Sequence, residues 1–309
     1  PLWSRGLGDV YKRQTLDTIF FNRLKSHALL LGSKPAVVLR DRFLTYGMLY
    51  SGIMSVQATI ARLGLKKSTP VGILVDSPSR HLLIALALLK SGYAISSLRS
   101  DLLDVAIQNG IVNVISDGTI FHRPDCNLIQ AAEYWFTANP GPADHTEPSP
   151  PDRFVCITFT SGTTGVPQPV AMTAPSLFGR VNSFCVARFA RFSRVMTTYD
   201  LSNAALHISM SVFQNANTIY FSPFDNVLET LGQYRLDALM GSIAQIEELA
   251  RRQRSSTNQI RLEFVQSGAG TMPAGIDRTI REVFGAEIAD CYFSSEAGEM
   301  GLAYGAIFV

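Results

Sequence analysis

Short apolar runs and amphipathic segments alternate along the chain from residue 15 onward. Strands of a buried parallel sheet are short and rich in β-branched and apolar residues, whereas apolar positions three or four apart predict a helix with one buried face. We predict strands at residues 36–39, 71–75, 93–96, 111–115, 154–158, 195–198, 218–221, 238–240, 262–265 and 287–292. Strands that alternate with helices are typical of βαβ units, so we predict an α/β fold with largely parallel sheets.

Helical periodicity between these runs predicts helices at residues 45–63, 79–90, 247–254 and 273–284. The second helix is expected to follow Ser77, a favourable N-cap, with Pro78 in the first turn, where its missing N–H is no loss. The longest apolar run, residues 82–89, is far shorter than the roughly 20 residues that cross a bilayer. We therefore expect no transmembrane segment.

A proline-rich segment predicts the organisation of the chain. Residues 138–152 hold five prolines in fifteen positions, which excludes a regular element and indicates a linker. We expect a first α/β subdomain at residues 15–137 and a second at 153–309. Residues 1–14 are predicted to be a non-native leader, because Asp-Val-Tyr-Lys-Arg-Gln at 9–14 resembles a translated sequencing adapter. The apolar run at 303–309 has no polar tail, which indicates a truncated chain.

Composition excludes some partners. The 309 residues are 47% hydrophobic and 17% charged, so the chain can bury the core of one large or two medium domains. A formal net charge of +2 is too small for an electrostatic footprint on nucleic acid. The four cysteines have no metal-site spacing and no secretory leader is visible, so we expect buried free thiols in a cytoplasmic protein.

The strongest chemical signal is the stretch Phe-Thr-Ser-Gly-Thr-Thr-Gly-Val-Pro-Gln-Pro-Val at residues 159–170. Glycines allow the backbone to approach a ligand closely, while hydroxyls and exposed amides donate to anionic oxygens. The spacing does not fit the P-loop pattern, so a P-loop NTPase is excluded. A polar loop between two strands is the alternative. The candidate phosphate-binding residues are Thr160, Ser161, Gly162, Thr163, Thr164, Gly165 and Gln168.

Two further motifs follow in order, Gln-Ser-Gly-Ala-Gly-Thr-Met-Pro at 266–273 and Asp-Cys-Tyr-Phe-Ser-Ser-Glu-Ala-Gly at 290–298. With residues 160–169 they resemble the T-S-G-T-T-G-x-P-K-G, S-G-G-A-P-L-P and N-x-Y-G-x-T-E-x-G motifs of the adenylate-forming superfamily. That superfamily includes acyl-CoA synthetases, the adenylation domains of nonribosomal peptide synthetases and firefly-type luciferases. The chain is identified as a member, and weaker similarity covers most of its length.

The resemblance implies two stacked α/β subdomains, the N-terminal large domain of the acyl-CoA synthetase-like fold, without the small β-barrel and C-terminal lid that follow in the family. It implies that ATP and Mg²⁺ are the cofactors. The implied adenine-binding residues are Gly268, Ala269, Gly270, Asp290 and Tyr292, whose ring stacks on the base. The implied catalytic residues are Ser295, which donates to the α-phosphate, and Glu296, which also holds the metal.

The implied activity is the activation of a small carboxylate, for example a fatty acid, through an acyl-adenylate with release of pyrophosphate. Coenzyme A or the phosphopantetheine thiol of a carrier protein then accepts the acyl group. An acyl-CoA synthetase is favoured over a peptide-synthetase adenylation domain, because Tyr199-Asp200 matches poorly the Asp that anchors an amino group there. The family's ribose-binding Asp and lid Lys are expected beyond residue 309, so this chain alone is expected to be inactive.

Two residues depart from the family pattern. Gln168 stands where the family usually has Lys, which exchanges a cation for a neutral donor. Phe293 stands where the family has Gly, which puts a ring where backbone is expected to approach the nucleotide. These departures leave a second hypothesis open, a catalytically silent paralogue that binds nucleotide without turnover.

Overall fold

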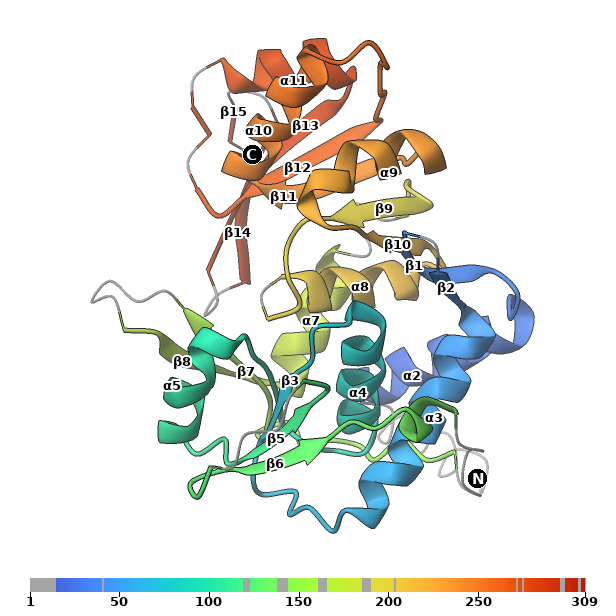
Figure 1. The fold of residues 1–309 in the computed structure, drawn as a ribbon, viewed down its shortest axis with the longest axis vertical. Helices are drawn as coiled ribbons and strands as arrows, with labels where there is room; N and C mark the ends of the chain where they lie inside the picture. The colour runs from blue at the N-terminus through green and yellow to red at the C-terminus, as the bar shows by residue number, and fades with distance from the viewer. Residues whose placement is uncertain are drawn as a thin grey trace, which may run out of the picture. The chain divides into compact units, whose positions relative to one another are not determined.

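The computed structural model describes residues 15–40, 42–118, 123–137, 144–160, 166–184, 190–202, 204–270, 272–273, 275–294, 298–304 and 307–308. The chain forms two compact units. Unit 1 comprises Pro1–Lys34 and Tyr46–Val181, and unit 2 comprises Pro35–Thr45 and Asn182–Val309. Each unit has its own mostly parallel sheet with helices (Figure 1), which confirms the predicted α/β class.

The sheet of unit 1 has the strand order β6-β5-β3-β4-β7-β8. All neighbours are parallel except β8, which is antiparallel to β7. Pro169 of β8 is opposite Phe159, and it is tolerated there because β8 is an edge strand. The strands are β3 (Val71–Leu74), β4 (Ile95–Ser97), β5 (Asn113–Ser116), β6 (Asn127–Gln130), β7 (Phe154–Thr160) and β8 (Gln168–Thr173).

The helices of unit 1 are α2 (Leu16–Leu30), α3 (Tyr46–Arg62), α4 (Pro78–Lys90), α5 (Leu103–Gln108) after a short 3₁₀ turn at Ser100–Leu102, α6 (Tyr134–Thr137) and α7 (Ala174–Phe184), of which residues 182–184 are assigned to unit 2. Helix α4 is buried from His81 to its last residue, Lys90. Ser77 and Pro78 occupy the predicted N-cap and first position, but the Ser77 hydroxyl makes no capping bond and instead lies 3.2 Å from the Ser79 hydroxyl.

The sheet of unit 2 has the strand order β15-β14-β13-β12-β11-β9-β10-β1-β2, and only β2, β14 and β15 pair in antiparallel fashion. Its strands are β1 (Pro35–Leu39), β2 (Arg42–Thr45), β9 (Arg194–Thr197), β10 (Thr218–Phe221), β11 (Ala238–Ser242), β12 (Phe264–Gly268), β13 (Glu287–Ser294), β14 (Gly298–Tyr304) and β15 (Ile307–Phe308). Its helices are α8 (Ala205–Gln214), α9 (Val227–Tyr234) after a 3₁₀ turn at Phe224–Asn226, α10 (Ile243–Arg254) and α11 (Ile276–Phe284).

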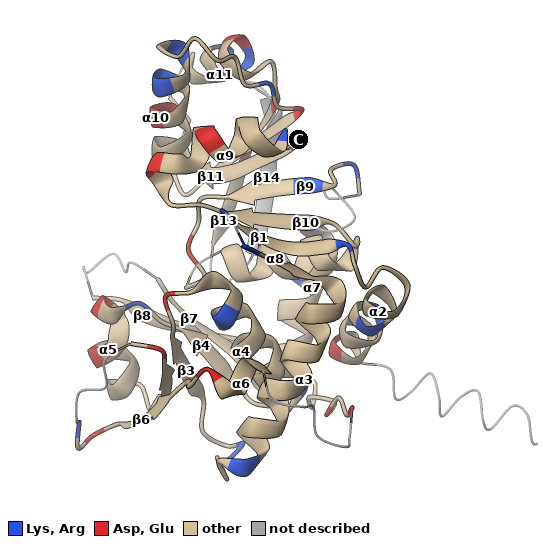
Figure 2. Ribbon diagram, turned by 45° about the vertical axis from the view of Figure 1, so that its right-hand side comes forward, with Lys and Arg blue, Asp and Glu red and all other residues tan. Residues whose placement is uncertain are grey.

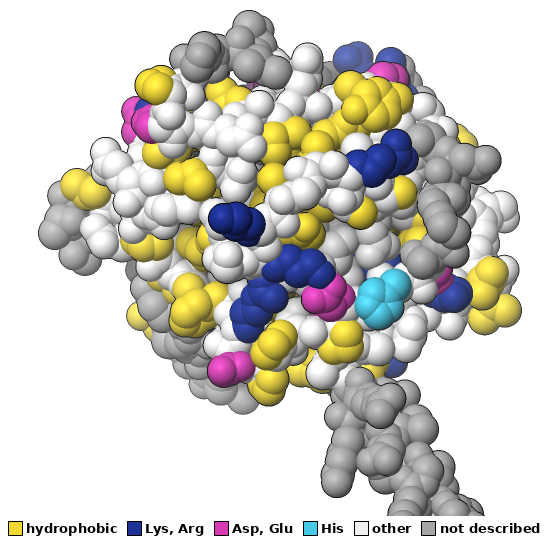
Figure 3. All heavy atoms as spheres, turned by 90° about the horizontal axis from the view of Figure 1, so that it is seen from below, with side chains coloured by type: hydrophobic (Ala, Val, Ile, Leu, Met, Phe, Trp, Pro, Cys, Tyr) yellow, Lys and Arg dark blue, Asp and Glu magenta, His cyan; other side chains and the backbone are white. Residues whose placement is uncertain are grey.

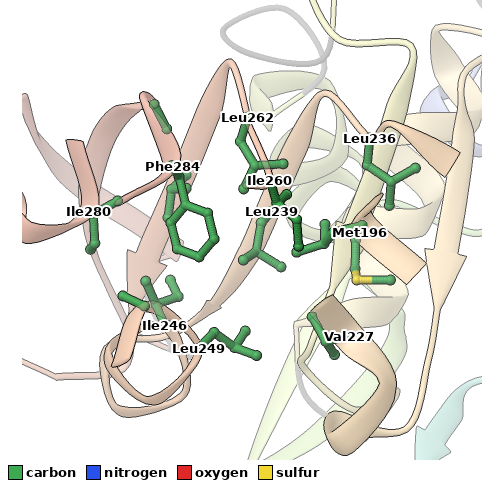
Figure 4. Packing of buried hydrophobic residues seen from close by; sticks show 14 of the residues in the cluster. Met196, Val227, Leu236, Leu239, Ile246, Leu249, Ile260, Leu262, Ile280 and Phe284 are labelled. Carbon is green, nitrogen blue, oxygen red and sulfur yellow. The ribbon is translucent and has the colours of Figure 1, made fainter. Parts of the chain in front are cut away.

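The core of unit 2 joins three helices to the sheet. Val227 of α9, Leu249 of α10 and Phe284 of α11 lie in one buried cluster with Leu239 of β11 (Figure 4). Each such side chain contributes about 1.5–3 kcal/mol on burial, so this core fixes the strands whose ends carry the second and third motifs. Charged residues lie mainly on helices and loops, as expected when the strands are buried (Figure 2).

The two units do not divide the chain at residues 138–152, where the sequence predicts a linker. Strands β7 and β8 come after that segment but complete the sheet of unit 1, and the hairpin β1–β2 joins the sheet of unit 2. Residues 144–150 contain no helix or strand, as their proline content predicts. Proline content reports on the local backbone, whereas the sheet that a strand joins is decided by partners far away in the sequence.

Candidate functional site

The second and third motifs meet at one edge of the unit 2 sheet. Strands β9, β11, β12 and β13 are neighbours and parallel, so their carboxyl ends lie at the same edge. Ser267 and Gly268 are paired in register with Asp290 and Cys291, respectively. Open α/β sheets bind ligands at this edge.

The turn after β12 is tight. Gly268 is buried, and Ala269 takes a left-handed conformation with φ 59°, which costs a non-glycine residue roughly 1–2 kcal/mol. A Cβ added to Gly270 would lie 3.0 Å from Cγ2 of Ile243 at the start of α10. The turn therefore keeps small residues against α10, and Ala269 and Gly270 are exposed.

Asp290 and Tyr292 extend from the same face of β13, because they are two residues apart on a strand. The Ser267 hydroxyl donates to Oδ1 of Asp290 at 2.7 Å. Within the described part of the chain, no hydrogen bond reaches the other oxygen, Oδ2. Tyr292 is 63% exposed, an unusual state for a large aromatic residue within an internal strand of a sheet.

Sequence reasoning missed a polar network that supports this edge. The Thr198 hydroxyl donates to Oε1 of Gln245 at 2.9 Å, and Nε2 of Gln245 donates to the Thr198 carbonyl. A Cβ on Gly241 would lie 2.2 Å from the Thr198 hydroxyl, so only glycine fits there. Gln245 also forms a capping box with Ser242, which explains why α10 begins at Ile243 and not at residue 247 as predicted. The Ser-x-x-Gln spacing at residues 242–245 was the signal in the sequence that could have predicted this helix start.

Tyr199 has a structural role. Its hydroxyl donates to the Gly241 carbonyl at 2.8 Å. Burial raises the pKa of Tyr199 well above its ordinary value, and the neighbouring Cys291 and Asp290 add to the effect. The hydroxyl therefore stays protonated and holds β9 to β11. Asp200, which follows it, is exposed and accepts a hydrogen bond from the Ser202 hydroxyl.

The first motif belongs to unit 1. Strand β7 ends at Thr160 and β8 begins at Gln168, and these two residues are paired in register. The side chain of Gln168 is exposed, and its amide donates to the Val166 carbonyl at 3.4 Å. The other residues predicted to bind phosphate, Ser161, Gly162, Thr163, Thr164 and Gly165, lie outside the described residues.

A buried histidine lies near the carboxyl ends of β3 and β4 in unit 1. Nδ1 of His81 is 3.1 Å from the Val75 carbonyl, and Nε2 is 2.8 Å from the Ser97 hydroxyl. Both ring nitrogens therefore have partners. We interpret His81 as a residue that ties α4 to two strand ends, which sequence reasoning did not single out.

The predicted metal site cannot be built from the described residues. Ser295 and Glu296 lie outside them, as does the side chain of Phe293. Among the residues that the structure does describe, no group of three His, Cys, Asp or Glu side chains could hold a metal ion. The β12–β13 edge itself offers an acceptor oxygen on Asp290, the exposed side chain of Tyr292 and a turn of small residues.

Three of the cysteines predicted to be thiols, Cys126, Cys156 and Cys291, are buried and form no disulfide among the described residues. Burial raises the pKa of the Cys156 thiol to about 12, so it is unreactive at neutral pH. No helix in the described ranges has the length and apolar character needed to cross a membrane.

Comparison with known proteins agrees with the three motifs. Residues 24–305 match the profile of the AMP-binding enzyme family. Because the match spans most of the chain, the chain belongs to this family of adenylate-forming enzymes. Enzymes of the family use ATP.

The relatives are distant and longer. The curated nonribosomal peptide synthetase GRA1 from Gibberella zeae is 23% identical over 181 residues, which are 51% of this chain and 2% of that protein. The fold is shared with the AMPPNP-bound nonribosomal peptide synthetase FmoA3 at a TM-score of 0.81 and 15% identity, over 94% of this chain and 32% of that one. The present chain thus spans about a third of FmoA3 and a small fraction of GRA1.

Two other solved structures share the fold. VinN in complex with L-aspartate has a TM-score of 0.80 at 15% identity, over 92% of this chain and 78% of VinN. The o-succinylbenzoate CoA synthetase MenE from Bacillus subtilis has a TM-score of 0.77 at 17% identity, over 92% of this chain and 61% of MenE. At these identities the likeness establishes the fold alone.

Proposed function

We propose that the chain is the nucleotide-binding part of an enzyme that activates a carboxylate with ATP. A carboxylate oxygen attacks the α-phosphorus, so that an acyl-adenylate forms and pyrophosphate leaves. A thiol sulfur of coenzyme A or of a carrier-protein phosphopantetheine then attacks the acyl carbon, and AMP leaves. The protein must hold the base, orient two anions and offset the charge that develops on phosphate.

The observation that carries this proposal is the arrangement at the β12–β13 edge. Ser267 fixes one oxygen of Asp290 and leaves Oδ2 for a donor such as the exocyclic amine of adenine. Tyr292 on the same face presents an exposed ring, and a base stacked on an aromatic ring gains about 1–3 kcal/mol. Residues 268–270 supply backbone that a base can approach closely.

The remaining roles rest on the family motifs. We assign the β- and γ-phosphates to Thr160, Gln168 and the loop between them, the α-phosphate to Ser295 and Mg²⁺ to Glu296. Mg²⁺ takes carboxylate and phosphate oxygens, and it neutralises phosphate charge when bound.

The acyl acceptor has two candidates. GRA1 and FmoA3 are named as nonribosomal peptide synthetases, whereas MenE is named as a CoA synthetase. The exposed position of Asp200 offers no buried carboxylate to anchor an amino group, which keeps a CoA-dependent acyl-CoA synthetase ahead of a peptide-synthetase adenylation domain.

A second candidate function is nucleotide binding without turnover. It is favoured by Gln168, whose neutral amide contacts only a neighbouring carbonyl in the described part of the chain. A charge-assisted hydrogen bond contributes about 1.5–3 kcal/mol against about 1 kcal/mol for a neutral one, so the exchange of Lys for Gln weakens the hold on phosphate.

Nucleotide binding tests the proposed adenine site at the β12–β13 edge directly. Titration of the chain with AMP, followed by tyrosine fluorescence and calorimetry, should saturate. Tyr292→Ala should weaken AMP about fivefold or more through lost stacking. Tyr134→Ala on α6, where Tyr134 is 57% exposed, is the matched control and should bind like the parent. Equal binding by the parent and Tyr292→Ala would remove the adenine assignment.

Exchange of labelled pyrophosphate into ATP tests the chemistry. The assay uses the protein encoded by the full gene, Mg²⁺ and a panel of fatty, aryl and amino acids. Exchange with one class of acid establishes adenylation and names the substrate class. Nucleotide binding without exchange for any acid supports the silent paralogue.

A further inference from the structure

We propose that unit 1 carries a second ligand site, a pocket for a small organic anion at the amino ends of β3 and β4. The pocket has a volume of about 570 Å³. That size lies within the range of about 300–1,000 Å³ for small-molecule sites. All of its lining residues belong to unit 1, and they include Met54, Ala58, Arg62, Lys67, His145 and Glu147.

The pocket is separate from the motif that starts after β7. Lys67 precedes β3, and Tyr93 precedes β4. Strand β7 is parallel to β4, so the loop that follows Thr160 leaves from the opposite edge of the same sheet. A ligand at Lys67 and Tyr93 therefore does not occupy the phosphate loop.

One wall of the pocket is irregular backbone that is held firmly in place. Residues 144–149 have no secondary structure, yet Nε2 of Gln57 donates to the His145 carbonyl at 2.8 Å. The Glu147 amide donates to the Lys90 carbonyl at 2.9 Å, and the Ser149 amide donates to Asp17 at 2.8 Å. Hydrogen bonds between the backbone of this segment and residues of three helices, two through side chains and one through backbone, thus fix the wall before any ligand arrives.

An ion cluster around the buried ammonium of Lys90 fixes the start of the same wall. Asp144 accepts from Nζ of Lys25 at 2.7 Å, from Nζ of Lys90 at 2.9 Å and from the Tyr50 hydroxyl at 2.7 Å. Lys90 is only 1% exposed, and its ammonium also donates to the Thr146 hydroxyl at 2.9 Å. A pocket built on such a support is preorganised, which lowers the entropy lost on binding.

The chemistry of the lining favours an anion with an apolar body. Met54, Ala58 and Ala61 present an apolar surface from α3. On the polar side Lys67 pairs with Glu147, so these charges offset each other. Arg62 donates to the carbonyl of Ala58 in its own helix at 3.3 Å and has no carboxylate partner among the described residues.

The charge left over at the pocket is therefore positive. Figure 3 views the surface on which α3 ends, and there Lys and Arg side chains gather with an acidic side chain and a histidine. A guanidinium matches a carboxylate or phosphate in bidentate geometry. The ligand class is a small organic anion with such a head group at Arg62 and a short apolar body over Met54 and Ala58.

The experiment is an NMR titration of the chain with hexanoate, hexyl phosphate and neutral hexanamide. The imidazole resonances of His145, assigned with His145→Gln, report on the pocket itself. Hexanoate or hexyl phosphate should shift them saturably, and hexanamide should bind at least about tenfold more weakly because it lacks the charge. Preference for one anion over the other identifies the head group.

Variants distinguish binding in the pocket from non-specific electrostatic attraction of anions and from binding at the proposed nucleotide site. Arg62→Ala should weaken the anion about tenfold, whereas Lys66→Ala, the same charge change next to the pocket lining, should change it less than about twofold. Ala58→Phe should fill the pocket and abolish the shift, while Asp290→Ala in unit 2 should leave it unchanged. Equal losses in Arg62→Ala and Lys66→Ala, or no saturable shift of His145, would overturn the proposal.

Discussion

Three carboxylates, Asp237 and Asp290 in unit 2 and Asp144 in unit 1, differ in how many of their oxygens have hydrogen-bond partners. Asp237 in unit 2 accepts hydrogen bonds on both oxygens from the backbone and side chains of Ser193 and Arg194. Asp144 in unit 1 likewise has both oxygens occupied, by Tyr50, Lys25 and Lys90. Asp290 has one oxygen held by Ser267 and the other without a partner in the described part of the chain.

The difference separates carboxylates whose two oxygens are both occupied within the fold from one that keeps an acceptor oxygen open in the described part of the chain. Buried polar groups in folded proteins are normally satisfied, so a saturated carboxylate is explained by structure. The half-satisfied Asp290 lies beside an exposed aromatic ring and a turn of small residues. That combination is expected of a site that is completed by a ligand.

The largest effect is expected from Asp144→Ala. The substitution leaves Lys90, 1% exposed, as an uncompensated buried charge, and breaking such a pair costs about 3–5 kcal/mol. Urea unfolding measures the loss. The control is Asp101→Ala, which removes an exposed pair with Arg99 and should cost less than about 1 kcal/mol. Similar costs for the two variants would contradict the structural role of Asp144.

Asp290→Ala should weaken nucleotide binding and leave the stability of the fold nearly unchanged. Loss of an acceptor for the adenine amine should weaken AMP about 10- to 100-fold, because hydrogen bonds to charged groups contribute about 1.5–3 kcal/mol. Asp290→Asn is the conservative control: its amide can donate to Ser267 while its oxygen accepts from the base. Calorimetric titration with AMP distinguishes the two. Unchanged affinity in Asp290→Ala would place the base elsewhere.

Acid should remove the folding stability that the Asp144 carboxylate contributes. Burial alone would raise the pKa of Asp144, but hydrogen bonds from Lys25, Tyr50 and Lys90 outweigh burial and hold the pKa well below its ordinary value. A depressed folded-state pKa gives stability that is complete above the unfolded-state value of about 3.9 and is lost as pH falls below it.

The gap in unfolding free energy between the parent and Asp144→Asn should therefore be constant above about pH 5. Below about pH 4 it should shrink by about 1.4 kcal/mol for each pH unit. Urea titrations at pH 7, 5 and 3 measure it. A gap at pH 3 as large as at pH 7 would mean that the carboxylate charge does not carry the stabilisation.

Gln168→Lys should have the smallest effect and should strengthen binding. A cation at the base of the phosphate loop should tighten ATP by about three- to tenfold, because a charge-assisted bond replaces a neutral one. AMP, which lacks the β- and γ-phosphates, should change little. Gln259→Lys makes the same charge change at an exposed position in unit 2 and serves as the control. Equal gains for ATP and AMP would indicate a general field effect.

Strands that are short apolar runs were predictable from the sequence, because burial on both faces leaves a direct mark on composition. Each predicted run coincides with or overlaps a strand of the structure. Strand β8 was missed because it contains Pro169 and follows a polar loop. Helix α8 was missed because it is apolar and buried nearly all round, so no period of 3.6 residues stands out.

The features of the candidate site likewise fall into those that the sequence predicts and those that only the folded chain decides. The three motifs are local, so the sequence alone determined the family, the glycine turn at 268–270 and the positions of Asp290 and Tyr292. The tertiary structure decided that Ser267 holds Asp290, that Tyr199 ties β9 to β11, and that residues 144–149 form a wall of unit 1 and not a free linker. Local sequence sets turn chemistry and burial preference, whereas bonds between residues 23 to 132 positions apart depend on strand register and packing, which only the folded chain defines.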